Sequence, residues 1–205
     1  GNQFLGNIRE TDAIIHVLRC FDNENIVHVD GSVNPVRDKE IIDLELQFKD
    51  LDTVENKIKR VEKQARVGGD KQAKLEYDVL MRFKEALEAG KSARTVVFDT
   101  EDEQLIAKNL FLLTSKPVLY VCNVDDTSAA NGNKYVDAVR EAIKDEHAEL
   151  LIISAQTEAD IAELESYEEK QMFLEDMGLK ESGCDRLIKA IYQLLNLQTY
   201  ITAGP

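Results

Sequence analysis

The sequence has no tryptophan, three prolines and three cysteines in 205 residues. The cysteines, Cys20, Cys122 and Cys184, are odd in number and far apart. This spacing excludes a disulfide framework and a Cys/His metal site, and it favours a reducing, cytoplasmic environment. No apolar run approaches the roughly 18 residues that a membrane span needs. The absences therefore predict a cytoplasmic protein with no membrane partner.

Positive charge is also scarce, because 25 lysines and arginines face 39 acidic residues and leave a formal charge of −14. Bulk attraction to a nucleic-acid backbone needs clustered cations, so no direct nucleic-acid binding is expected from this acidic segment itself. One local cluster stands out: Lys57, Lys59, Arg60, Lys63, Arg66, Lys71 and Lys74. It is either a contact stripe or the solvated flank of a coiled coil, interleaved with Glu55 and Glu62.

The pattern of apolar residues changes in the middle of the chain. Strand-and-helix patterns run to about Asp30 and resume near Lys116, and two long amphipathic helices are predicted between them, over 38–66 and 70–89. At 1.5 Å per residue the first helix would be about 40 Å long. The pattern predicts an antiparallel two-helix coiled-coil arm inserted into an α/β domain.

The apolar residues of the two helices indicate which faces meet. Apolar residues of the first helix recur in steps of three and four, which is typical of a coiled-coil seam, with one extra step of three (a stammer) before Val54. These residues are Leu44, Phe48, Leu51, Val54, Ile58, Val61 and Ala65. The residues of the second helix that are predicted to face this seam are Ala73, Tyr77, Leu80 and Leu87. Asp70 is a suitable N-cap, and Gly90 can end the helix in a left-handed turn.

Outside the arm, apolar runs alternate with helical patterns. The predicted strands cover 13–20, 116–123 and 150–154, and the predicted helices cover 4–8, 101–113, 133–145, 158–164, 167–177 and 184–195. Such alternation is typical of a parallel sheet with right-handed crossovers. His16, inside the first strand, suits a packed core position better than a catalytic one. The predicted domains are 1–37 and 94–205, which form two parts of an α/β domain, and the arm, 38–93.

Polar segments follow two predicted strands, and ligands of parallel sheets bind at these strand ends. The segments are Asn123-Val124-Asp125-Asp126 and Ser154-Ala155-Gln156-Thr157-Glu158. In P-loop nucleotide hydrolases, a strand-end Asn with a carboxylate three residues later reads a purine, and a Ser-Ala from the next strand closes the same pocket. Amide and carboxylate groups supply the donors and acceptors that a purine edge needs. Ordinary loop turns are the alternative interpretation.

The elements that bind phosphate are absent from the sequence. No Gly-x-x-x-x-Gly-Lys-Ser/Thr motif occurs, and Gly90-Lys91-Ser92 only imitates its end. That tripeptide follows a helix, whereas a phosphate loop must lie between a strand and a helix. Magnesium-binding segments are also missing, so we expect no nucleotide hydrolysis from this chain alone.

The sequence resembles the YchF, or Obg-like, ATPases over its whole length. The matching segments are 1–14, 19–21, 26–29, 33–35, 50–55, 69–70, 112–117, 158–164 and 195–204. The resemblance implies a ribosome-associated, translation-factor-class P-loop NTPase with an inserted coiled-coil arm, which binds ATP, or GTP less well, with Mg²⁺. It implies that Asn123 and the Val124 backbone contact the base, and that Ser154, Ala155 and Gln156 close the pocket. Asp126 stands where the family has the longer Glu.

In that family the P-loop and the magnesium ligands would lie before Gly1, and a small TGS domain would lie after Pro205. The chain also opens without Met, which suggests a piece of a longer protein. Two hypotheses remain open. The first is the base-recognising part and arm of an ATPase, and the second is a non-catalytic interaction module in which the arm binds a protein or ribosomal partner.

Overall fold

The computed structural model describes residues 2–26, 31–67, 70–146 and 148–199. Parts of four segments that carry the family resemblance, at 1, 27–29, 69 and 200–204, lie outside these ranges. The chain forms two compact units: unit 1 comprises Gly1–Asp12 and Glu40–Pro117, and unit 2 comprises Ala13–Lys39 and Val118–Pro205. The predicted division into 1–37, 38–93 and 94–205 remains a prediction.

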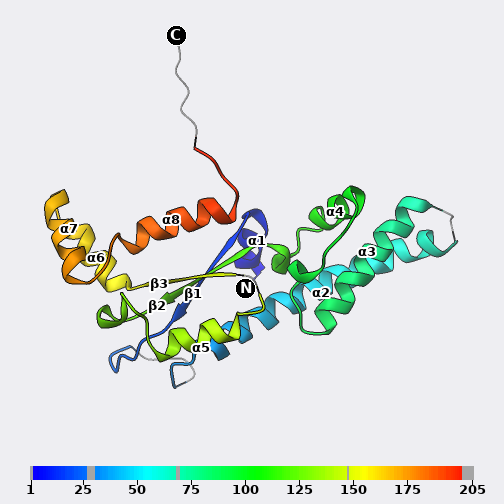
Figure 1. The fold of residues 1–205 in the computed structure, drawn as a ribbon. Coiled ribbons are helices and arrows are strands. Elements are labelled where there is room, and N and C mark those ends of the chain that lie inside the picture. Colours follow the sequence, from blue (N-terminus) through cyan, green and yellow to red (C-terminus); the bar gives the residue numbers. More distant parts are fainter. Residues whose placement is uncertain (1, 27–30, 68–69, 147, 200–205) are drawn as a thin grey trace, which may run out of the picture. The chain divides into compact units, whose positions relative to one another are not determined.

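Unit 2 is built on a parallel sheet in the order β1-β2-β3, with β1 at Ile14–Arg19, β2 at Val118–Asn123 and β3 at Glu149–Ile153 (Figure 1). All three predicted strands are confirmed, as is their parallel pairing. The central strand β2 has a neighbour on each side and is buried almost throughout. His16 of β1 packs with its ring centroid 5.7 Å from that of Tyr120.

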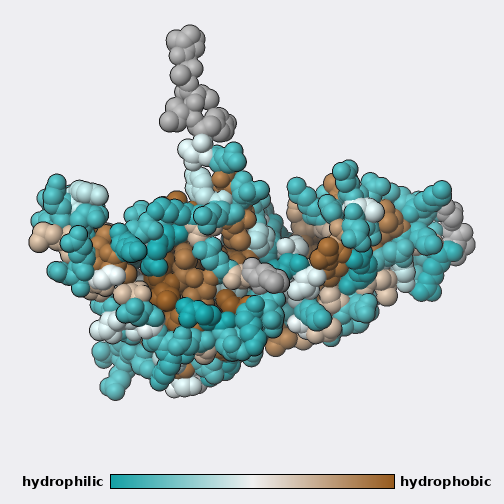
Figure 2. All heavy atoms as spheres, viewed as in Figure 1, coloured by the Kyte–Doolittle hydropathy of each residue, from teal (hydrophilic) through white to brown (hydrophobic). Residues whose placement is uncertain are grey.

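The strand β1 is buried on one face only, although its apolar run is typical of a buried parallel strand. Its side chains alternate: Leu18 is 2% exposed, while Ile15 and Val17 are 41% and 61% exposed. The described residues cover only one face of this strand, and a continuous apolar run does not say how many faces are covered. Apolar surface gathers over the sheet between α8 and α5 in Figure 2, consistent with this exposure.

The helices of unit 2 are α5 (Lys134–Ala142), α6 (Ala155–Glu163), α7 (Tyr167–Asp176) and α8 (Gly183–Leu194). Each begins after a side chain that accepts a backbone N–H of its first turn, namely Asn133, Ser154, Ser166 and Ser182. Val136 and Val139 of α5 are fully buried against the sheet core of Leu18, Tyr120 and Cys122. The four predicted helices are confirmed, with shifted ends.

The predicted helical hairpin is formed by α2 (Pro35–Val67) and α3 (Lys71–Glu88). Asp70 caps α3 by accepting the N–H groups of Gln72 and Ala73, and Gly90 after it has a φ of 70°. The helices are antiparallel, since Lys84 lies 2.8 Å from Glu55 whereas Arg66, farther along α2, meets Tyr77, earlier in α3. Val54, Leu80, Phe83 and Leu87 form the centre of their common core.

The predicted seam is wrong at its upstream end. Leu44 and Phe48 are 48% and 63% exposed, whereas Gln47, Asp50 and Val54 are buried. The buried face therefore keeps its spacing without a stammer and includes two polar residues. Apolar periodicity missed it because the partners that satisfy these polar groups are remote: Ser92 Oγ lies 3.5 Å from Gln47, and the Asp50 carboxylate binds the 113–114 segment.

Unit 1 also contains α1 (Asn2–Glu10), α4 (Glu101–Lys108) and two short 3₁₀ turns, at Ala93–Thr95 and Leu113–Ser115. Thr100 and Glu103 form a capping box at the start of α4. The helix ends before the predicted residue 113, and Phe111 beyond it has a φ of 50°. Within the described ranges, no helix combines the length and the apolarity required to cross a membrane.

Candidate functional site at the strand ends

The two predicted polar segments leave neighbouring strands at the same edge of the sheet. Asn123 ends β2 and pairs with Ile153, which ends β3, and Ser154 follows directly. The N–H of Val124 donates to the Ile153 carbonyl at 3.0 Å and extends this pairing by one step. The parallel register thus brings residues about 30 positions apart into one cluster.

The amide of Asn123 has a fixed orientation. Its Oδ1 accepts the backbone N–H of Ala155 at 3.0 Å, so its Nδ2 is the group turned away from that contact. Within the described part of the chain, Nδ2 has no hydrogen-bond partner. The arrangement leaves two N–H donors for a ligand, and it commits the N–H of Ala155 to the protein.

Asp126 is held from the other strand end. Its Oδ1 accepts the hydroxyl of Ser154 at 2.6 Å and that of Thr157 at 2.9 Å. Ser154 and Thr157 are 2% and 0% exposed, so neither hydroxyl is free to turn toward solvent. Among the described residues Oδ2 has no partner, and a carboxylate oxygen can accept two hydrogen bonds. One oxygen of Asp126 is therefore anchored, and the other is open.

The neighbouring carboxylate, Asp125, serves its own loop. It accepts the hydroxyl of Thr127, and the N–H and hydroxyl of Ser128 at 3.0 Å each. These hydrogen bonds, with that from Thr127 the strongest, lower the pKa of Asp125 below its ordinary value. Asp125 thus stabilises the turn, and Asp126 faces the cluster.

The chain is similar to known proteins over its whole length. No family model matches it. It is 52% identical over 206 residues to the ribosome-binding ATPase YchF of Bacillus subtilis, covering all of this chain and 56% of that protein. It is 38% identical to Obg-like ATPase 1 of Gallus gallus, of which it covers 52%. The chain belongs to the YchF/Obg-like ATPase family.

A solved structure described as that of the Schizosaccharomyces pombe YchF GTPase matches the whole chain and 55% of its own length, with a TM-score of 0.88 and 30% identity. The predicted fold class is confirmed: a parallel α/β sheet of P-loop NTPase type, with a two-helix antiparallel arm inserted in the sequence. The chain spans about half the length of the curated YchF relatives that it matches.

In this YchF-type chain, hydrogen bonds join four of the predicted site residues, Asn123, Asp126, Ser154 and Ala155, and Val124 joins them through its backbone. The Gln156 side chain binds Asp160 on its own helix instead. Sequence reasoning did not assign a site role to Thr157. Its place three residues after the helix-capping Ser154 was the available signal. The described residues contain no group of three or more His, Cys, Asp or Glu side chains that could hold a metal ion.

Proposed function

We propose that this chain is the base-reading part and the coiled-coil arm of a cytoplasmic, ribosome-associated protein that binds and hydrolyses ATP, and GTP less well. The relatives named as ribosome-binding ATPases support the ribosome and the nucleotide as partners. Mg²⁺ would accompany the nucleotide. The observation that carries the proposal is the fixed Asn123 amide beside the half-anchored Asp126.

The hydrogen-bonding groups suit adenine. Its N7 accepts and its N6 amino group donates, whereas guanine presents acceptors at both N7 and O6. Nδ2 of Asn123 would donate to N7, and the open Oδ2 of Asp126 would accept from N6. Guanine O6 would face the same carboxylate as an acceptor, which supports the preference for ATP. Val124, Ser154, Ala155 and Gln156 would shape the pocket around these two contacts.

Calorimetric titration of Mg-ATP and Mg-GTP into the complete protein tests the base site. Asn123→Ala should weaken the binding of both nucleotides by roughly tenfold. The variant loses the neutral amide N–H that would donate to N7, an acceptor that adenine and guanine share. Asn109→Ala, which removes an exposed amide at the end of α4, is the matched control and should leave both affinities unchanged. Equal affinities in the Asn123 variant and the wild type would contradict the assignment.

Hydrolysis is expected to need more than the 205 residues. We expect the isolated chain to release no phosphate from Mg-ATP, and the complete protein to do so slowly. A phosphate-release assay on both, at equal concentration, separates these expectations. Turnover by the isolated chain would show that the phosphate-handling groups lie within it.

The alternative function is a non-catalytic interaction module in which the arm binds a partner. The surface of the arm supports this alternative. Lys59, Arg60 and Lys63 are exposed near the end of α2, on a chain that is otherwise acidic. Replacement of 38–89 by a short linker should abolish co-sedimentation with ribosomes and preserve ATP binding, if the arm contacts the ribosome. Unchanged co-sedimentation would exclude the arm as the segment that binds the ribosome.

A further inference from the structure

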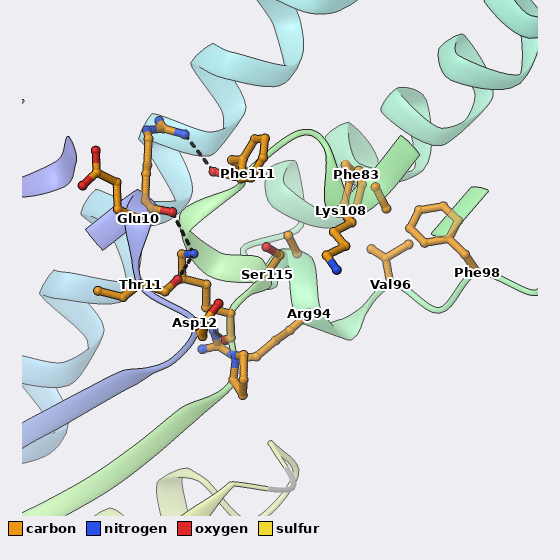
Figure 3. Close-up of a pocket in the computed structure, with 15 residues that line it drawn as sticks. Glu10, Thr11, Asp12, Phe83, Arg94, Val96, Phe98, Lys108, Phe111 and Ser115 are labelled. Carbon is orange, nitrogen blue, oxygen red and sulfur yellow. Dashed lines mark hydrogen bonds between the residues drawn. The ribbon is translucent and has the colours of Figure 1, made fainter. Parts of the chain in front are cut away.

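A pocket of about 780 Å³ lies within unit 1 and shares no residue with the strand-end cluster (Figure 3). One side is apolar and is built from Phe83, Val96 and Phe98, with the two phenyl rings in edge contact at 5.1 Å. The volume falls in the range of about 300–1,000 Å³ that is typical of pockets for small molecules. Its size and apolar wall suit a ring or a branched aliphatic group.

The charges that line the pocket differ from those of the chain as a whole. Four lining residues are basic and two are acidic, although the chain carries a formal charge of −14: the basic ones are Arg9, Arg94, Lys108 and Lys116, and the acidic ones are Glu10 and Asp12. Bases outnumber acids around this pocket, so its lining favours an anion, unlike the chain as a whole.

Three of the four cations are already used to hold the backbone. Arg9 donates to the Phe111 carbonyl at 3.0 Å, Arg94 donates to the Thr114 carbonyl at 3.0 Å, and Lys116 donates to the Arg9 carbonyl at 3.0 Å. Lys108 differs, because its ammonium has no hydrogen-bond or ion-pair partner among the described residues. In Figure 3 its side chain points into the pocket.

The backbone beside Lys108 is strained. Phe111 adopts a left-handed φ of 50°, which an aromatic residue rarely does, and its ring lines the pocket while remaining 59% exposed. Such strain persists where the surroundings enforce it, and it concentrates at ligand sites. Arg9 donates to the Phe111 carbonyl at 3.0 Å, so this left-handed residue is tied to another residue that lines the pocket.

We propose that this pocket binds a small aromatic or branched aliphatic carboxylate. The apolar part would lie against Phe83, Val96 and Phe98, and the carboxylate would accept hydrogen bonds from Lys108. The ammonium would gain a charge-assisted partner that the described residues do not provide. This ligand is additional to the nucleotide of the proposed function, and the inference does not depend on it.

The test is an NMR titration of the complete protein with phenylacetate, and with two matched probes that each lack one feature. Phenylacetamide keeps the ring without the charge, and acetate keeps the charge without the ring. Phenylacetate should shift the resonances of Val96 and Lys108 saturably, with a Kd in the millimolar range expected for so small a ligand. Both matched probes should bind roughly tenfold more weakly or not saturate.

Lys108→Gln should weaken phenylacetate binding roughly tenfold, and Lys91→Gln, an exposed lysine outside the pocket, should leave it unchanged. Three outcomes would each overturn the proposal: no saturable shift at 50 mM phenylacetate (about ten times the expected Kd), equal binding of the acid and its amide, or unchanged binding in Lys108→Gln. Because Lys108 is exposed, its substitution should not impair folding, and the Mg-ATP affinity of the same variant serves as the check.

Discussion

The carboxylate of Asp50 accepts both the backbone N–H and the hydroxyl of Thr114, each at 2.7 Å. Its other oxygen accepts the N–H of Leu113 at 2.7 Å, and Asp50 itself is completely buried. One side chain in the middle of α2 thereby satisfies a turn more than 60 residues away. This relationship explains why a charged residue occupies the buried face of the hairpin.

Replacement of that carboxylate should destabilise unit 1. In either orientation of its amide, Asp50→Asn turns an NH₂ group toward at least one of these backbone donors, and buried unsatisfied donors cost about 1–3 kcal/mol. The free energy of unfolding, measured in urea, should fall by about that amount. Asp52→Asn, an exposed change two residues away, is the control and should alter it by less than about 0.5 kcal/mol.

The effect of Asp50 should depend on pH. Burial, which outweighs the hydrogen bonds from Thr114 and Leu113, raises the pKa of Asp50 above its ordinary value of 3.8. A raised carboxyl pKa means that the fold favours the protonated form, so the stability from Asp50 is complete below pH 3.8 and declines as the pH rises through the folded pKa. The stability difference between wild type and Asp50→Asn should therefore shrink as the pH is raised. A difference that grows instead would mean that the hydrogen bonds favour the ionised form.

The hairpin core should tolerate little truncation. Leu80 is 0% exposed at the centre of the cluster shared by α2 and α3, so Leu80→Ala should cost about 2–5 kcal/mol. Met81 is next in sequence but 38% exposed, and Met81→Ala should cost clearly less. Urea unfolding followed by circular dichroism compares the two, and equal losses would contradict the packing described for the arm.

Two glycines should respond oppositely to the same change. A Cβ at Gly183 would lie 2.8 Å from both the Glu158 carboxylate and the Ile153 side chain, so Gly183→Ala should lose about 1–3 kcal/mol. At Gly6, inside α1, a Cβ meets nothing within 4 Å. Gly6→Ala should therefore be neutral or stabilise by up to about 1 kcal/mol. Melting temperatures of the two variants decide the matter.

Glu158 should control the reactivity of Cys184. Its carboxylate accepts the N–H groups of Gly183 and Cys184, and its hydrogen bond with the thiol raises the pKa of Cys184. Glu158→Gln should lower that pKa and speed alkylation by iodoacetamide at pH 8, because the thiolate is the reactive form. Glu163→Gln, on the same helix, is the control and should change neither the pKa of Cys184 nor its rate of alkylation. Cys20 and Cys122 are buried and should not compete in the native protein.

Local patterns predicted what depends on neighbouring residues. The Asp70 cap, the left-handed Gly90 and the strands that end at Asn123 and near Ser154 are set by residues within a few positions, so the sequence indicates them directly. The buried face of α2 was misplaced because Asp50 is satisfied by residues 113 and 114, which no periodicity reveals. Likewise Thr157 acts through the direction of one hydroxyl, which only the folded strand ends define.

The hydroxyl of Ser154 has two simultaneous tasks. It accepts the N–H of Thr157 at the start of α6, and it donates to Asp126 across the sheet edge. Fraying of that first helical turn and release of the Asp126 carboxylate are consequently coupled through one hydroxyl. The rate of deuterium uptake at the Thr157 amide therefore reports on the strand-end cluster. It should slow when a ligand binds Asp126, and its measurement requires no attached probe.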